Sequence, residues 1–351
     1  MHPLIAAVGA AVEFLLGTAL ITAVAGSVAR TVLVPRDRSS RLVRGALRIS
    51  LASARIAAKP GCRDGGKPRL IDLVGPAGMF AVLLAWLAGL LVGFGLLAAA
   101  AGSARGSANP LVALLLPVAA AQGGAIGQAA AIAFWLSAVA VLACFASHLG
   151  TVAAAYGRRE RTVRRMATQA VRPPDAEDLI AAHLHGGAHT VDPLLLEWDR
   201  WFSDLRASHS AYPVLANLPR NGNLCWLEAT VIALDTAALV DAIAPSRAVP
   251  AARALLRSGT ACLAELADHL GVAVPKSQVS LQGREEYDFF DTVNRAVAAG
   301  LPAERDEHRA WAVFQDWRQA YAPHASAIAA HLLCYCPPPE PVDVPRRSDV
   351  P

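Results

Sequence analysis

Three long apolar stretches in the first half of the chain constrain its fold more than any other feature. They run over residues 4–34, 73–101 and 126–156, and the second and third contain no formally charged residue. A helix needs about 20 apolar residues to cross the hydrocarbon core of a bilayer, so each stretch is long enough even when tilted. Hydrophobic residues make up 54% of the chain and charged residues 17%, which is more apolar than a typical soluble protein. The sequence therefore predicts an all-α membrane protein with three transmembrane helices, the first within residues 1–34.

Basic residues outside these stretches predict the orientation. The segment 36–69 holds ten Lys or Arg residues and two acids, and a second basic cluster follows residue 157. The connection between the second and third stretches holds a single basic residue, Arg105. Basic residues accumulate on the cytoplasmic side of a membrane. We therefore expect a multi-pass protein whose N-terminus is outside and whose residues after 157 are cytoplasmic.

Two shorter segments complete the membrane half. In the basic loop 35–70, arginines at helical spacing predict an amphipathic helix, which would lie on anionic inner-leaflet lipids or form a solvated linker. The apolar segment 110–122 is too short to cross a membrane and contains Pro117, which would interrupt a helix. It is typical of a re-entrant, pore-like piece or of an interfacial one. Within the second span, Gly89 and Gly93 form a GxxxG pair, which favours close helix packing.

The second half, 157–336, is predicted to be a helical cytoplasmic domain. Apolar and aromatic residues recur at helical spacing, and we expect helices near 194–205, 224–243, 249–270, 285–299 and 304–335. The five tryptophans of this half fall in these segments, where they are more typical of a core than of a ligand box. The proline-rich tail 337–351 is expected to be disordered.

The order of these segments resembles the bacterial two-transmembrane potassium-channel-like family, particularly members with a leading extra span and a helical C-terminal domain. The stretches that carry the resemblance are 93–97 (GFGLL), 156–160 (YGRRE), 196–201 (LEWDRW), 208–215 (SHSAYPVL) and 226–229 (WLEA), followed by Trp311, Trp317 and Tyr321. The resemblance implies a two-helix pore module over 71–156, with outer helix 73–101, re-entrant piece 110–122 and inner helix 126–156. It also implies a homo-oligomer in the bacterial inner (plasma) membrane and a monovalent cation as the transported ion.

The selectivity filter of that family is degenerate in this chain. Such channels use a Thr-x-Gly-Tyr/Phe-Gly filter whose backbone carbonyls replace the hydration shell of potassium. The corresponding region, 109–127, has no threonine and no aromatic residue, and it retains only Gln122, Gly123 and Gly124 as a counterpart. We therefore expect ion selectivity to be altered or lost.

Polar residues in the third stretch are the candidates for lining a pore, because polar groups within a span usually face protein or water. Hydrogen bonding between helices is the alternative, and it suits Ser and Thr well. A histidine at this depth would titrate near neutral pH and could gate. The candidates are Gln128, Ser137, Ser147, His148 and Thr151.

No motif in the chain predicts an enzyme, a cofactor or a nucleic-acid partner. The six cysteines form no CxxC motif, and His183 and His185 are two residues apart, a spacing that does not share a helical face. We expect no catalytic residue and no metal site. Two functions therefore remain: a channel-like protein with altered selectivity, or a non-conducting membrane-anchored scaffold or sensor that acts through its cytoplasmic helical domain.

Overall fold

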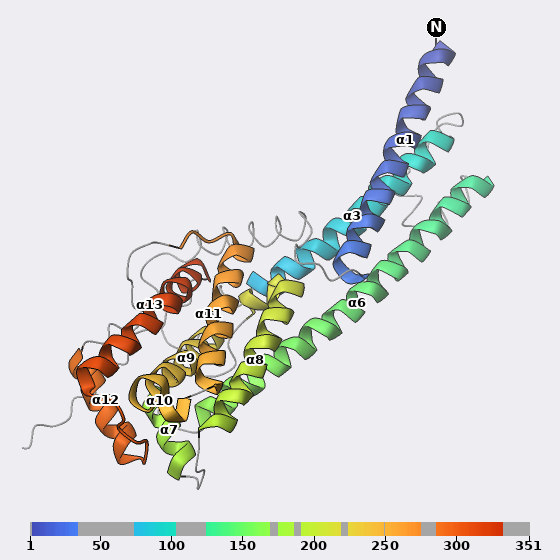
Figure 1. Cartoon of the computed structure of the whole chain (residues 1–351). Coiled ribbons are helices and arrows are strands. Elements are labelled where there is room, and N and C mark those ends of the chain that lie inside the picture. Colours follow the sequence, from blue (N-terminus) through green and yellow to red (C-terminus); the bar gives the residue numbers. More distant parts are fainter. Residues whose placement is uncertain are drawn as a thin grey trace, which may run out of the picture. The chain divides into compact units, whose positions relative to one another are not determined.

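The computed structural model shows helices and no strand in the residues that it describes, which are 2–33, 74–102, 124–168, 175–185, 191–218, 224–248, 250–274 and 286–332 (Figure 1). The expected all-α class is confirmed for these residues. The basic loop 35–70, the re-entrant piece 110–122 and the tail 337–351 lie outside the described residues. Predictions about these three segments therefore stay predictions.

Three helices are long and apolar enough to cross a membrane, as the sequence predicts. The first is α1 (His2–Val28), which continues into a short π-helical turn, η1 (Ala29–Leu33). The others are α3 (Val74–Gly102) and α6 (Gly124–Thr168). Many of their exposed side chains are large and apolar. This suits contact with lipid, where a helix makes all its backbone hydrogen bonds internally.

Glycines bring α1 and α3 into close contact. A Cβ atom built on Gly17 would lie 2.8 Å from the carbonyl oxygen of Gly93, and one built on Gly93 would lie 2.7 Å from Ile21. A Cβ atom on Gly89 would likewise lie 2.7 Å from Val24. Small residues let transmembrane helices approach closely, where packing rather than the hydrophobic effect holds them together. The Gly89–Gly93 pair thus has the packing role that its spacing predicts.

Aromatic side chains fill the space between α3 and its neighbours. Trp86 is buried and donates a hydrogen bond from Nε1 to the Ser27 hydroxyl of α1, at 3.1 Å. This bond satisfies a donor that would otherwise be costly to bury. On the other side, Phe94 of α3 meets Phe134 of α6 edge to face, with ring centroids 6.2 Å apart.

Helix α6 extends well beyond the predicted span. Its 45 residues correspond to about 68 Å, more than twice the roughly 30 Å of a hydrocarbon core. The apolar run ends at Tyr156, but the helix continues to Thr168. The added residues are mostly Arg, Glu, Met and Ala, which are good helix formers, and they contain no proline.

The remaining residues form a second group of helices, which confirms the predicted helical character of this half. The central element is α9 (Trp226–Ile243), in which every residue except Glu228 is buried. A mostly apolar helix that is buried on all sides is expected at the centre of a domain. It contacts α7, α10, α11 and α13. The elements around it are α7 (Ala176–His185), α8 (Asp192–Ala211), α10 (Pro245–Ala248), α11 (Ala251–Leu270), α12 (Glu286–Ala298) and α13 (Glu307–Leu332).

Local sequence signals explain where these helices begin and end. Glu228 returns to the backbone N–H of Cys225 in a capping box at the start of α9. At the end of α11, Gly271 has φ +67°, and its backbone N–H bonds back to α11 carbonyls. This left-handed conformation suits glycine at a helix C-terminus.

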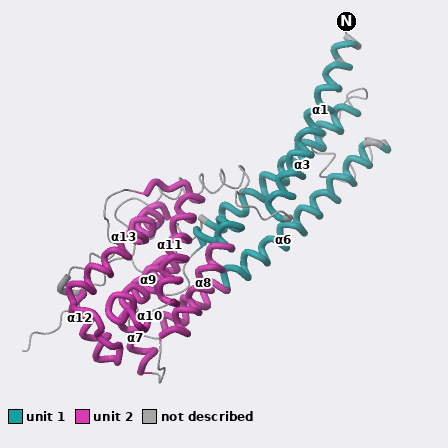
Figure 2. Tube along the Cα trace, in the orientation of Figure 1, with its two compact units in different colours: residues 1–157, 208–219 teal, residues 158–207, 220–351 magenta. Residues whose placement is uncertain are grey.

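The chain forms two compact units, which Figure 2 shows in different colours. Unit 1 comprises residues 1–157 and 208–219, and unit 2 comprises residues 158–207 and 220–351. The segment 208–219 lies in the half of the sequence assigned to the cytoplasmic domain, yet it groups with the apolar helices. Helix α6 contributes residues to both units.

Replacing Gly17 with Val tests the α1–α3 contact. The new side chain meets the backbone of Gly93, which cannot rotate away. We expect thermal and denaturant unfolding in detergent to show a loss of about 1–3 kcal/mol, as for other overpacked sites. The matched control is Gly9→Val in the same helix, where a Cβ atom meets nothing within 4 Å. Equal stability of the two variants would contradict this packing.

Candidate functional site

The five polar candidates of α6 differ in exposure. Ser137 and His148 are half-buried, whereas Gln128, Ser147 and Thr151 are exposed. At about 100° of rotation per residue, Ser137, His148 and Thr151 fall within about 60° of one another. Ser147 lies beside them at about 40° from Thr151, and Gln128 lies about 140° from Thr151. Four of the five candidates therefore share one flank of the helix.

This flank, which we call the polar flank, is also lined with small side chains. Two of its hydroxyls bond to the helix's own backbone: Ser137 Oγ donates to the Ala133 carbonyl and Thr151 Oγ1 to the His148 carbonyl, each at 2.7 Å. These back-bonds satisfy the hydroxyls inside a span. The small residues on the same flank are Ala140, which is exposed, and Ala133 and Cys144, which also pack partly against the core of unit 1.

An apolar face lies next to the polar flank. It consists of large exposed side chains that suit contact with lipid. The face on the far side packs against the core of unit 1 through residues such as Phe134 and Phe145. Helix α6 thus has three distinct surfaces, of which the polar flank is the one suited to water or a second helix. The exposed apolar residues are Ile132, Trp135, Leu136, Val139 and Leu142.

Of the three predicted filter residues, the structure describes only the last. Gln122 and Gly123 lie outside the described residues, and Gly124 is the first residue of α6. The structure therefore supplies no geometry for an ion-binding loop at this position.

The segment 208–219 packs against α6 in unit 1. A short 3-10 helix, η3 (Pro213–Asn217), buries Val214 and Leu215 in a cluster with Val152 and Ala155 of α6. One turn earlier on α6, the His148 ring meets the Tyr212 ring edge to face, with centroids 5.5 Å apart. His148, one of the pore-lining candidates, is therefore in contact with a segment from the second half of the sequence.

The first turn of α3 supports the same segment. A Cβ atom built on Gly75 would lie 2.8 Å from the Asn217 carbonyl oxygen and 2.9 Å from Leu218. Glycine at this position is what permits the approach. In the sequence, the stretch 208–215 is notable only because it carries part of the family resemblance. The signals that point to docking are the Tyr-Pro start of η3 and two adjacent apolar residues, Val214 and Leu215, within a loop.

In unit 2, the continuation of α6 contains a buried pair of opposite charges. Arg159 and Glu160 are 3% and 1% exposed, and Arg159 Nη2 lies 2.9 Å from Glu160 Oε1. The guanidinium carbon also lies 5.6 Å from the centre of the Trp226 ring at the start of α9. Buried charges need such partners because desolvation is expensive. The contact with Trp226 joins this part of α6 to the start of α9.

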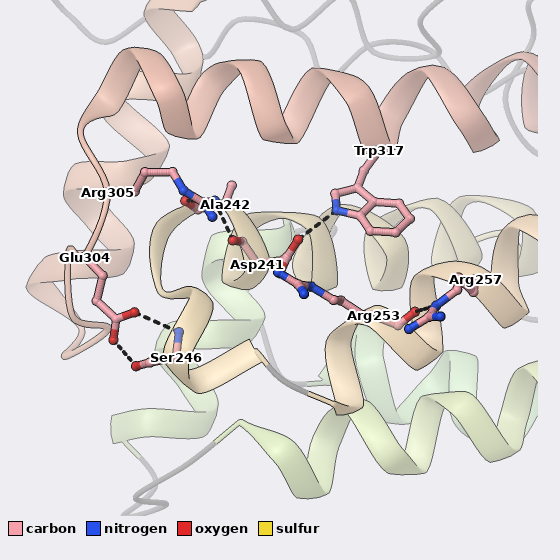
Figure 3. A network of polar contacts seen from close by, with 8 residues as sticks. All are labelled: Asp241, Ala242, Ser246, Arg253, Arg257, Glu304, Arg305 and Trp317. Atoms are coloured by element: carbon pink, nitrogen blue, oxygen red, sulfur yellow. Dashed lines mark hydrogen bonds and ion pairs between the residues drawn. The ribbon is translucent and has the colours of Figure 1, made fainter.

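A polar network around Asp241 fixes the end of α9 (Figure 3). The buried Asp241 carboxylate accepts hydrogen bonds from Arg253 Nε and Trp317 Nε1, each at 2.9 Å. Arg305 Nη1 donates to the backbone carbonyls of Asp241 and Ala242 at 2.8 and 2.9 Å. Carbonyls at a helix C-terminus have no partner within the helix, so Arg305 caps α9.

A second clamp lies beside the Asp241 network. Glu304 accepts hydrogen bonds from the backbone N–H and the hydroxyl of Ser246 (Figure 3). The Ser246 hydroxyl bond is the main cause that lowers the pKa of Glu304 below its usual value. The polar groups of both networks are engaged in hydrogen bonds within the fold. We therefore assign these networks to stability rather than to chemistry.

The described residues contain no group of three or more His, Cys, Asp or Glu side chains that could hold a metal ion. His183 and His185 lie in the last turn of α7. Among the cysteines, Cys262 is buried, and desolvation raises the pKa of its thiol to about 12. A thiol of that pKa is a poor nucleophile at neutral pH.

No protein-family model, curated protein or solved structure matches this chain.

Replacing Gly75 with Val tests the docking of 208–219. The added side chain collides with the Asn217 backbone, so we expect η3 to separate from α3. Hydrogen exchange should then become at least about tenfold faster for the backbone amides of 215–218, since their protection depends on that local contact. The Gly150→Val control on α6 meets nothing within 4 Å and should leave exchange unchanged. Unaltered protection in the Gly75 variant would show that docking does not depend on this contact.

Proposed function

We propose that this chain is a potassium-channel-like integral membrane protein with lost or altered ion selectivity. In this proposal, copies of the chain form a homo-oligomer with the polar flank of α6 toward its axis. The observation that carries the proposal is the division of α6 into a polar flank, an apolar exposed face and a packed face. A helix at hydrocarbon depth needs a polar flank only where it meets water or protein. The altered selectivity rests on the filter residues missing from 109–127.

The same proposal assigns a regulatory role to unit 2. The protein lies in the bacterial inner membrane, with its N-terminus outside and unit 2 in the cytoplasm. Two features support coupling between unit 2 and the spans. Helix α6 is continuous from Gly124 to Thr168 and is buried in unit 2 at Arg159 and Glu160. The segment 208–219 leaves unit 2, packs on α6 in unit 1 and then returns to unit 2.

A second candidate function is a non-conducting scaffold or sensor that works through unit 2. One observation favours it: the hydroxyls of Ser137 and Thr151 are already satisfied by carbonyls of α6 itself. A flank of small, internally satisfied residues suits close packing of helices as well as contact with water. In this alternative, α6 would transmit movement without lining a permeation path.

Ion flux from liposomes separates the two candidates. Purified full-length protein is reconstituted, and K⁺ and Na⁺ efflux are followed with ion-sensitive dyes. We expect both ions to pass at rates within about a few-fold of each other, because carbonyl-filter selectivity requires residues that this chain lacks. Ser147→Phe on the polar flank should reduce flux by about tenfold or more, since a bulky ring narrows a lined pore.

The matched control is Val139→Phe on the exposed apolar face of α6, which should leave flux unchanged. Flux no higher than in protein-free liposomes, for both ions, would overturn conduction and leave the scaffold or sensor. Equal loss in both variants would contradict the assignment of the polar flank to a pore.

A further inference from the structure

Arg318 is a buried cation at the centre of unit 2. It lies on α13, where it is 3% exposed, and it faces Asp235 of α9, which is 2% exposed. Tyr321, one turn along α13, is fully buried beside them. The pair therefore sits between α9 and α13, the two helices with the most extensive contact in unit 2.

Asp235 does not satisfy the Arg318 guanidinium. The Tyr321 hydroxyl donates a hydrogen bond to Asp235 Oδ1, and Arg318 Nε is 3.7 Å from that same oxygen. This distance is too long for a hydrogen bond. Arg318 Nε, Nη1 and Nη2 are all buried, and none of them has a hydrogen-bond partner among the described residues. Leaving a buried donor unsatisfied destabilises the fold, and more so when the donor is charged.

The guanidinium edge formed by Nη1 and Nη2 of Arg318 has no hydrogen-bond partner among the described residues. The guanidinium carbon lies 5.8 Å from the centre of the Phe314 ring, so an apolar aromatic group is its neighbour there. A guanidinium donates five hydrogen bonds within its own plane. Two parallel donors match two oxygens of a carboxylate or phosphate, which is the geometry of the strongest charge-assisted hydrogen bonds.

We propose that unit 2 binds a small oxyanion, a carboxylate or a phosphate group, at Arg318 in the α9–α13 core. Tyr321 holds Asp235 aside, so that the Nη1 and Nη2 edge receives the anion while Asp235 partly balances the charge. An ion pair at 3.7 Å without hydrogen bonds does not by itself account for a buried arginine. Apolar residues of similar size would stabilise the core as well or better. The inference goes beyond the proposed function and does not depend on whether the protein conducts ions.

The test is thermal unfolding of the full-length protein in detergent, followed by near-ultraviolet circular dichroism. Sodium acetate, sodium phosphate and sodium chloride are added in separate titrations at constant ionic strength. A ligand that binds only the folded state raises the unfolding temperature, by about 5 °C when it is far above its dissociation constant. We expect this rise with acetate or phosphate beyond the chloride series, and whichever salt acts identifies the oxyanion class.

Variants assign the effect to Arg318. Arg318→Lys keeps the charge but loses the paired donors, so the rise should disappear. Arg257→Lys, at an exposed arginine of α11, is the matched control and should keep it. Tyr321→Phe frees Asp235 to pair with Arg318, and it should weaken the response severalfold even if Arg318 variants fail to fold. No rise beyond chloride in the wild type, or an equal rise in Arg318→Lys, would overturn the proposal.

Discussion

The structure depends on one helix that must satisfy two environments. At hydrocarbon depth, α6 has to present apolar side chains and satisfy its backbone internally. Only a few residues later, the same helix buries Arg159 and Glu160, which require a paired, polar setting. The helix is continuous from Gly124 to Thr168 and so contains both regions. The docked segment 208–219 adds a second connection by packing on α6 near His148 and on the start of α3.

The apolar spans and the helical second half could be predicted from the sequence because both depend on local patterns. Apolar runs longer than 20 residues, two of them without a charged residue, identify the spans. Regular spacing of aromatic and aliphatic residues identifies α8, α9, α11 and α13. The Gly89–Gly93 pair was also readable, because close helix approach has a short-range signature. The length of α6 was missed, since a change from apolar to charged residues marks the end of a membrane span but not the end of a helix.

The candidate site was only partly accessible to sequence reasoning. Helical geometry groups Ser137, His148 and Thr151 on one flank, which the spacing predicts, and it separates Gln128 from them. The partners of His148 and Gly75 lie more than 60 residues away along the chain, so no periodicity could reveal them. The Arg318–Asp235 pair is similar, because neither residue belongs to a motif and only burial makes the guanidinium unusual. The contacts of His148 and Gly75 and the burial of the cation are thus consequences of tertiary structure.

Continuity of α6 is the central claim, and a distance between two spin labels on this helix tests it most directly. Labels at Leu142 and Arg164, both exposed, are separated by 22 residues, which corresponds to about 33 Å along an unbroken α-helix. Gly150 and Gly157 lie between them, and each has open space around its Cα atom, so a bend would occur there if the helix were not rigid. Pulsed electron paramagnetic resonance on protein reconstituted in a bilayer should give one narrow distribution near that distance. A broad distribution, or a clearly shorter distance, would contradict the continuous helix.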